Sequence, residues 1–120
     1  MKRVEVWWAD LGPYRQGEQT GRRPVVVWQS DTLTKVLHSV LVIPITTNLK
    51  RAKLAGTAMI AASDDGLPEE SVALAFQIRA IPKSALQSRV RSLSEEELAE
   101  LELATDEAVG RVEPESDNLG

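Results

Sequence analysis

Side chains that could do chemistry are unevenly spread along this chain of 120 residues. Residues 1–58 carry nine lysine and arginine residues against four acids, a balance of +5. Residues 59–120 carry five against fourteen, a balance of −9. A basic half favours a polyanionic partner such as nucleic acid. Charge alone leaves open the alternative that basic residues cluster by chance on a solvated surface.

Two residue counts exclude whole classes of site. The chain has no cysteine, which excludes disulfides, thiolate zinc sites and a cysteine nucleophile. Its single histidine, His38, excludes a metal site built on two histidines and argues against a Ser-His-Asp triad. The acidic pairs Asp64-Asp65 and Glu69-Glu70 flank a Gly-Leu-Pro turn, which indicates solvated carboxylates. We therefore predict no metal site.

Short strands separated by turns must position the remaining polar side chains. Runs of β-branched, aromatic and apolar residues predict strands over residues 4–10, 24–29, 39–45, 56–61 and 89–93. Residues 71–81 form one long strand or two strands joined by a bend, and residues 31–37 a helical turn. Pro24 fits the first position of its strand. Long loops often carry function, and two are predicted here, at residues 11–23 and 46–51.

The C-terminal part of the chain has the pattern of one helix and a polar tail. Ser94 and Glu97 match a capping box, which predicts a helix from this point to about Val109. Gly110 suits its end. Residues 111–120 are polar, so we expect a disordered tail after a single domain over residues 1–110.

The order of elements indicates the fold class. Helical crossovers between strands are absent from the pattern, which favours antiparallel hairpins over a parallel sheet. We expect a mainly β fold, a small curled barrel covered by the C-terminal helix. The N-terminus meets a charge at Lys2, too early for a signal peptide, and no apolar run approaches membrane-spanning length. A cytoplasmic protein without membrane contact is therefore expected.

Four segments, taken in order, resemble the MazF/PemK toxin family. The first combines residues 7–13 (WWADLGP) with residues 17–27 (GEQTGRRPVVV). The second is VIPITTN at residues 42–48, the third SVALAFQIRAI at residues 71–81, and the fourth LSEEEL at residues 93–98. The match covers roughly residues 2–110, and the Gly-Glu-Gln…Arg-Pro element is its most specific part.

The resemblance implies a fold, an activity and partners. The fold would be an SH3-like small β-barrel of the MazF/PemK/CcdB type that forms a homodimer. The activity would be sequence-specific cleavage of single-stranded RNA (mRNA) without metal or other cofactor. The 2′-hydroxyl would attack the adjacent phosphorus and leave a 2′,3′-cyclic phosphate and a 5′-hydroxyl. The protein would be the toxin of a type II toxin–antitoxin system, whose cognate antitoxin covers the RNA site with a flexible tail.

The resemblance also implies Arg23 and Thr46 as catalytic residues. An arginine brings a permanent charge and a donor fork that matches two phosphate oxygens. Thr46, at the end of an apolar strand, could donate its hydroxyl to the same oxygens. Because a guanidinium is a poor general base, Glu18 in the loop before Arg23 is the candidate proton acceptor. The alternative is that Glu18 is only a loop carboxylate paired with Arg22 or Arg15.

Seven further polar residues, in the matching segments and in the basic loop at residues 46–51, are predicted to bind RNA. They are Gln19, Thr47, Asn48, Lys50, Arg51, Gln77 and Arg79. Gln77 and Arg79 alternate in a strand and could instead face solvent. The three tryptophans lie in strand patterns, which favours packing over base stacking.

The chain departs from the family pattern at two positions. Phe76 stands where relatives have an acid before the glutamine, which argues against the chemistry that uses this acid and leaves an inactive family member as an alternative. Val4 replaces a glycine that is usual near the first strand, a change we expect to be structural only. A CcdB-like toxin that binds a protein target such as DNA gyrase, without catalysis, is the other alternative.

Overall fold

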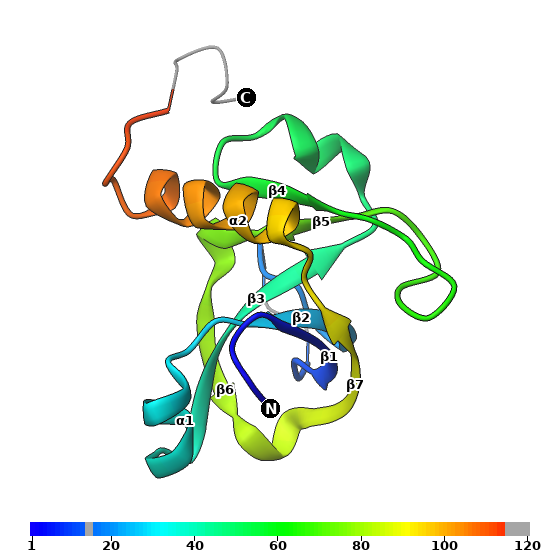
Figure 1. Cartoon of the computed structure of the whole chain (residues 1–120), viewed down its shortest axis with the longest axis vertical. Coiled ribbons are helices and arrows are strands. Elements are labelled where there is room, and N and C mark those ends of the chain that lie inside the picture. The colour runs from blue at the N-terminus through cyan, green and yellow to red at the C-terminus, as the bar shows by residue number, and fades with distance from the viewer. Residues whose placement is uncertain (14–15, 115–120) are drawn as a thin grey trace.

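The computed structural model describes residues 1–13 and 16–114 (Figure 1). These residues form a mainly β fold with a C-terminal helix, which confirms the predicted fold class. The strands are β1 (Glu5–Asp10), β2 (Arg22–Val27), β3 (Ser39–Thr46), β4 (Thr57–Ile60), β5 (Ser71–Leu74), β6 (Arg79–Pro82) and β7 (Leu86–Ser92). The α-helices are α1 (Asp31–Val36) and α2 (Glu95–Ala108), and the short 3-10 turns are Leu49–Lys53, Ala75–Gln77 and Lys83–Ala85.

Strand β3 is the centre of an antiparallel sheet. The strands follow the order β4-β5-β3-β2-β1-β7, and β6 pairs with β3 outside this path. The first half of β3 pairs with β6, its middle with β2, and its last two residues with β5. Because one strand serves partners on both edges along its length, the sheet curls on itself, as the ribbon shows (Figure 1). The curl brings the ends of β2 and β3 next to the loop after β1.

Side chains of the central strands alternate between two apolar clusters. One face of β2 and β3 packs against β4, the following loop and helix α2, through Val26, Ile43, Ile45, Ile60, Leu67 and Leu101. The other face fills the curl of the sheet through Ala9, Val25, Val27, Val40, Val42 and Ile81. Trp8 and Trp28 pack on the first cluster and Trp7 on the second, which confirms packing for the tryptophans. Burial on both faces makes the central strands a rigid support.

Several boundaries differ from the predicted ones. Strand β2 begins at Arg22, because Arg22 and Arg23 still pair with β1, so Pro24 lies inside the strand opposite Trp8. Residues 71–81 form two strands joined by a 3-10 bend. The 3-10 turn Leu49–Lys53 begins inside the predicted basic loop 46–51 and extends two residues beyond it. Strand β7 begins at Leu86, three residues before the predicted start.

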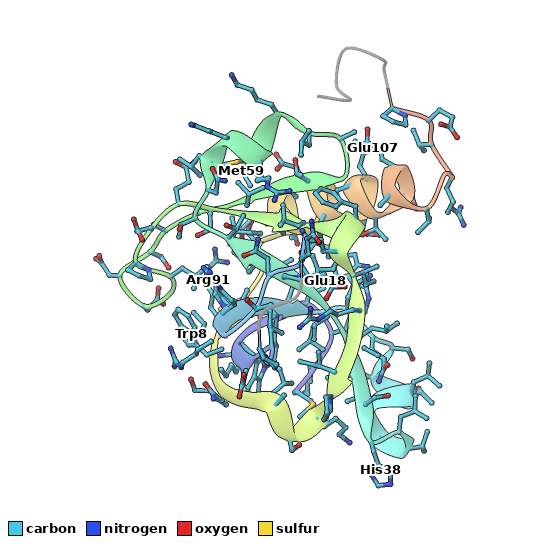
Figure 2. All side chains as sticks on the ribbon, turned by 180° about the vertical axis from the view of Figure 1, so that it is seen from behind. Trp8, Glu18, His38, Met59, Arg91 and Glu107 are labelled. Carbon is cyan, nitrogen blue, oxygen red and sulfur yellow. The ribbon has the colours of Figure 1, made fainter. Side chains whose placement is uncertain are left out.

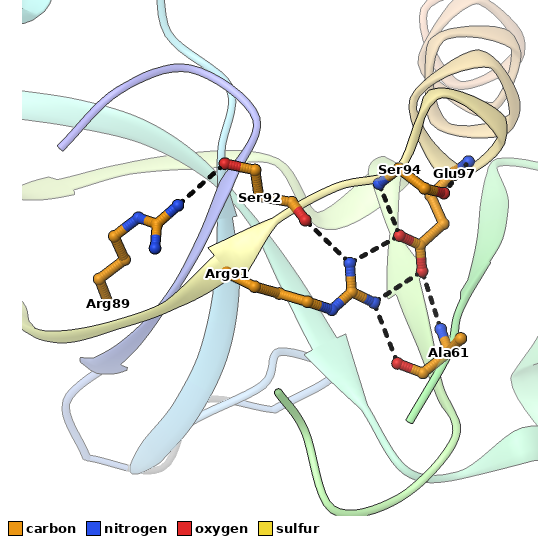
Figure 3. Close-up of polar contacts among 6 residues, drawn as sticks. All are labelled: Ala61, Arg89, Arg91, Ser92, Ser94 and Glu97. Atoms are coloured by element: carbon orange, nitrogen blue, oxygen red, sulfur yellow. Dashed lines mark hydrogen bonds and ion pairs between the residues drawn. The ribbon is translucent and has the colours of Figure 1, made fainter. Parts of the chain in front are cut away.

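A buried carboxylate fastens helix α2 to the sheet (Figure 3). Glu97 forms the predicted capping box with Ser94, and it also accepts a hydrogen bond from the Ala61 N–H at 2.8 Å. Both terminal nitrogens of Arg91 donate to Glu97, at 2.7 and 2.8 Å. Burial raises the pKa of Glu97, but the hydrogen bonds from Arg91, Ser94 and Ala61 outweigh it and lower the pKa to about 2. The sequence indicated only the capping role.

The chain after α2 folds back on the helix end. Gly110 takes a left-handed conformation (φ 80°), and the Arg111 N–H donates to the Asp106 carbonyl at 2.8 Å. Of the predicted tail, residues 115–120 lie outside the described residues. Within the described part of the chain, neither helix has the length and apolar character to cross a membrane.

Val4 is the one described non-glycine residue with a left-handed backbone, at φ 69°. Its N–H donates to the Val27 carbonyl and its carbonyl accepts from the Leu93 N–H, at 2.8 and 2.9 Å. These bonds tie the chain start to β2 and to the end of β7. A β-branched side chain is strained in this conformation, whereas glycine is not. The family glycine therefore has a conformational reason, and Val4 strains the backbone.

Candidate active site

The loop between β1 and β2 is held by side chains more than fifty residues away in the sequence. The Gln77 side chain accepts from the Gln19 N–H at 3.0 Å and donates to the Gly17 carbonyl at 3.1 Å. Arg79 donates to the Leu11 carbonyl at 2.7 Å and forms an ion pair with Glu18 at 2.8 Å. Four of the predicted site residues, Glu18, Gln19, Gln77 and Arg79, are thus brought together at the loop. Glu18 pairs with Arg79 rather than with Arg22, and Arg15 lies outside the described residues.

Arg23 lies at the second position of β2, where this loop enters the sheet. It is paired with Ala9 of β1, and its side chain is exposed. The Arg23 Nε donates to the Thr20 carbonyl at 3.1 Å, which fixes the plane of the guanidinium. Neither terminal nitrogen donates to a described residue. The two parallel donors of the fork are therefore available to an anion such as a phosphate.

Thr46 is the last residue of β3, at the same end of the sheet as Arg23. The register of β2 and β3 pairs Val27 with Val42 and Val25 with Pro44. The β2–β3 pairing ends there, and Arg23 and Thr46 each lie two residues beyond it, Arg23 paired with Ala9 of β1 and Thr46 with Val72 of β5. The Thr46 side chain is 6% exposed, and its hydroxyl oxygen accepts from the Asn48 N–H at 3.2 Å. The hydroxyl hydrogen is left to donate.

A cleft of about 230 Å³ opens beside these strand ends. Arg23 lines it together with Ile45 and Thr47, which flank Thr46, although Thr46 itself is not among the lining residues. Residues from the loop before β5 and from β1 form the rest of the wall. The cleft therefore connects Arg23 with the end of β3.

Sequence reasoning missed several residues that line this cleft. Arg22 and Trp8 form one wall, and the Arg22 guanidinium carbon lies 4.3 Å from the centre of the Trp8 ring. Glu69 and Ser71 line the opposite side. Only a weak signal for these two residues was present in the sequence, because Trp8 lies inside the predicted strand 4–10 and Arg22 lies in the predicted loop 11–23, next to Arg23. Glu69 could not have been found, because only the folded loop brings it here.

The remaining predicted RNA-binding residues lie on the turn after β3. The Asn48 side chain accepts from the Lys50 N–H at 3.3 Å and starts the turn Leu49–Lys53. Lys50 and Lys53 are exposed and Arg51 is half-buried. No hydrogen bond or ion pair among the described residues joins this basic turn to Arg23.

Phe76 points away from the loop that its neighbour Gln77 holds. Its side chain is 42% exposed and lines a groove of about 300 Å³ with Gly56, Glu107 and Ala108, beside helix α2. A side chain at Gly56 would come within 3.3 Å of the Phe76 ring, so the ring packs directly on the glycine. The position that carries an acid in relatives is therefore apolar here and faces the helix end.

Half of the fourteen acids in residues 59–120 lie on helix α2, on the opposite side from the loop. Helix α2 carries seven acids, Glu95, Glu96, Glu97, Glu100, Glu102, Asp106 and Glu107. The helix is in front in Figure 1, whereas Glu18 and its loop face the reader in Figure 2, which is seen from behind. These seven charges therefore lie away from Arg23, whereas Glu69, another acid of the same half, lines the cleft beside it.

Comparison with known proteins places these features in one family. A model of the family described as "PemK-like, MazF-like toxin of type II toxin-antitoxin system" matches residues 2–108. A protein named Endoribonuclease MazF from Staphylococcus saprophyticus is 37% identical over 110 residues, which are 92% of both chains. A protein of the same name from Staphylococcus epidermidis is 36% identical over the same length, with the same coverage.

Solved structures resemble the fold. A crystal structure of MazF from Deinococcus radiodurans superposes with a TM-score of 0.77, covering 92% of this chain and 96% of that one, at 21% identity. An endoribonuclease from a mycobacterial species, solved in complex with its cognate antitoxin, gives a TM-score of 0.76 at 18% identity, with 95% and 99% covered. Identities this low support the fold alone.

Proposed function

The chain belongs to the PemK-like, MazF-like toxins of type II toxin–antitoxin systems and is an endoribonuclease, and we propose that it cleaves single-stranded RNA at Arg23 and Thr46. The observation that supports this assignment is the shared strand end: Arg23 and Thr46 each lie two residues beyond the last β2–β3 pair, Val25 with Pro44, and Arg23 lines the cleft there together with Ile45 and Thr47, the neighbours of Thr46. Relatives at 36–37% identity are named endoribonucleases, so no observation favours a CcdB-like toxin that acts on gyrase.

The chemistry follows from what the two side chains offer. The 2′-hydroxyl of the RNA loses its proton and attacks the adjacent phosphorus, and a 2′,3′-cyclic phosphate forms. The bond to the 5′-oxygen of the next nucleotide breaks, and this oxygen takes a proton from water to become the 5′-hydroxyl. Negative charge concentrates on the non-bridging oxygens in the transition state. The two terminal nitrogens of Arg23 stabilise this charge, and the Thr46 hydroxyl donates a further hydrogen bond. The nucleophile belongs to the substrate. The protein therefore needs only to position the RNA and to neutralise the charge that develops on the phosphate.

Glu18 is the proposed acceptor of the 2′-hydroxyl proton. It lies on the anchored loop, two residues before Thr20, whose carbonyl holds Arg23. Its carboxylate is 42% exposed and held by Arg79 at 2.8 Å, so it has a fixed position and is open to a substrate. A carboxylate in this place has the geometry of a general base only if the ribose lies between the loop and Arg23.

An antitoxin is the regulatory partner of this toxin. We propose that a flexible antitoxin tail covers the cleft at Arg23, and that Gln19, Thr47, Asn48, Lys50 and Arg51 contact the RNA backbone or bases. We also propose a homodimer that acts on mRNA in the cytoplasm. Exposed apolar side chains near the end of α2, Phe76, Val109 and Val112, support a protein partner on that side.

The test is cleavage of a long single-stranded RNA by the purified chain in excess EDTA, with the termini identified by mass spectrometry. We expect 2′,3′-cyclic phosphate and 5′-hydroxyl ends. Arg23→Ala and Thr46→Val should each reduce the rate at least a hundredfold while thermal unfolding stays close to that of the parent. A DNA strand of the same sequence should stay intact, because it lacks the attacking hydroxyl. Products with 3′-hydroxyl ends, a requirement for magnesium, or full activity of Arg23→Ala would refute the proposal.

A further inference from the structure

The cleft beside Arg23 has a shape and a lining that the cleavage chemistry does not use. Its floor is apolar and is formed by Pro24, Ile45 and Leu67, of which Leu67 is 2% exposed. Its volume of about 230 Å³ is below the range of roughly 300–1,000 Å³ that drug-sized ligands occupy, so a single flat ring system is the size that fits. The attacking ribose and the phosphate would occupy only the edge of the cleft, next to Arg23.

One wall of the cleft is a stacked pair of planar groups. The Arg22 guanidinium lies over the Trp8 ring, with 4.3 Å between its central carbon and the ring centre. Its Nε donates to the Gln87 side chain at 2.9 Å, which fixes the orientation of the plane. Neither terminal nitrogen of Arg22 donates to a described residue. A guanidinium held flat in this way offers its free face and edge to another planar group.

The opposite wall is acidic. Glu69 is exposed at the rim, and its backbone carbonyl accepts from the Ser71 hydroxyl at 2.9 Å, which anchors the loop next to β5. A carboxylate at this place repels a phosphate but accepts hydrogen bonds from the N–H groups of a nucleobase. Figure 2 shows Trp8 on the same side of the molecule as Arg91, beside the loop that carries Glu69. The Glu69 carboxylate thus disfavours a phosphate on its side of the cleft, whereas Arg23 favours one at the edge.

We propose that this cleft binds one unpaired RNA base, the base next to the cleaved phosphate, with the Arg22–Trp8 pair as its stacking wall and Glu69 as its hydrogen-bond acceptor. The inference rests on the proposed function, because it supplies the base readout that accompanies cleavage at Arg23. Since stacked bases gain affinity without sequence information, Glu69 is the residue that selects among bases.

The test selects binders from a randomised pool of 2′-O-methyl RNA, which cannot be cleaved because the attacking hydroxyl is blocked. We expect the parent chain to enrich one base at one position. Arg22→Ala should abolish that enrichment and weaken binding about tenfold or more, and Glu69→Gln should change the enriched base at the same position. Arg22→Lys, which keeps the charge without the plane, should restore affinity but not the enrichment.

Arg3→Ala is the matched control. Arg3 lies over Trp28 at the same distance, 4.3 Å, but lines no part of the cleft, so its loss should leave binding and base preference unchanged. Enrichment that Arg22→Ala leaves intact would overturn the inference. Equal weakening of all sequences by Arg22→Ala, fully restored by Arg22→Lys, would also overturn it, by making Arg22 a phosphate contact. The binding assay does not depend on cleavage. Absence of nuclease activity would therefore refute the proposed function but would not decide whether the cleft binds a base.

Discussion

Replacing Glu97 with glutamine tests how the C-terminal helix is fastened to the sheet. The carboxylate accepts two hydrogen bonds from Arg91 and one each from the N–H groups of Ser94 and Ala61, at 2.7 to 2.9 Å. Glutamine has one acceptor oxygen, and its amide hydrogens would face donors. A pKa of about 2 instead of 4.5 corresponds to a stabilisation of about 3 kcal/mol. We expect E97Q to lower the free energy of unfolding at pH 7 by that amount.

The same linkage predicts a pH dependence. The pKa of Glu97 is lower in the folded than in the unfolded chain, so the unfolded chain binds the proton first as the pH falls. The stabilisation is therefore complete above about pH 5 and is lost progressively between about pH 5 and pH 2. The difference between the parent and E97Q should narrow over this range. Urea unfolding followed by tryptophan fluorescence at several pH values measures both curves.

Glu95→Gln is the matched control for this measurement. Glu95 is an exposed acid in the first turn of the same helix and has no hydrogen bond to a described residue. Its replacement should cost less than about 1 kcal/mol, which is the range of an exposed charge near a helix N-terminus. A cost of E97Q below about 1 kcal/mol at pH 7, or a difference that stays constant from pH 7 to pH 2, would refute the reasoning.

Four further predictions concern the site and the chain start. Arg23→Lys keeps the charge but loses the two-donor fork, so kcat in steady-state cleavage should fall at least tenfold with little change in KM. Gln77→Ala should increase hydrogen exchange at the Gln19 amide and lower kcat about tenfold, because the loop loses its anchor. RNA affinity should fall about tenfold or more between 50 and 200 mM salt in a filter-binding assay, and a flat salt response would contradict a phosphate site. Val4→Gly relieves a strain of about 1–2 kcal/mol at a cost of about 0.5–1 kcal/mol in chain entropy, so the urea midpoint should rise; a fall would show that the φ of 69° is not strained.

Local patterns were sufficient to predict most elements of the fold. Apolar runs marked the strands, and the Ser94–Glu97 spacing located the start of α2, because both signals act within a few residues. The boundaries failed where pairing with a distant strand decides them. Strand β2 extends back to Arg22 because Arg22 and Arg23 pair with β1. The prediction began this strand at Pro24, because a proline usually stands at the first position of a strand.

The site was less predictable for the same reason. Arg23 and Thr46 came from a family motif, and neither periodicity nor charge would have singled them out. The contacts of Gln77 with Gly17 and Gln19 span about sixty residues and depend on where the curled sheet puts the bend after β5. The ion pair of Arg79 and Glu18 has the same origin. Sequence spacing carries no information on such contacts. It therefore could not decide whether these side chains face solvent, contact RNA or hold the loop.

The anchored loop gives Gln77 a route to the chemistry that does not require it to touch RNA. Gln77 fixes Gly17 and Gln19, the next residue is Thr20, and the Thr20 carbonyl holds the Nε of Arg23. A shift of this loop therefore turns the guanidinium plane and misdirects both free donors. A side chain that binds RNA directly would change KM when it is removed, whereas one that only orients Arg23 would change kcat. The two predictions for Gln77 thus differ in the kinetic constant they affect, and loss of kcat at unchanged KM would identify the glutamine as a positioning residue.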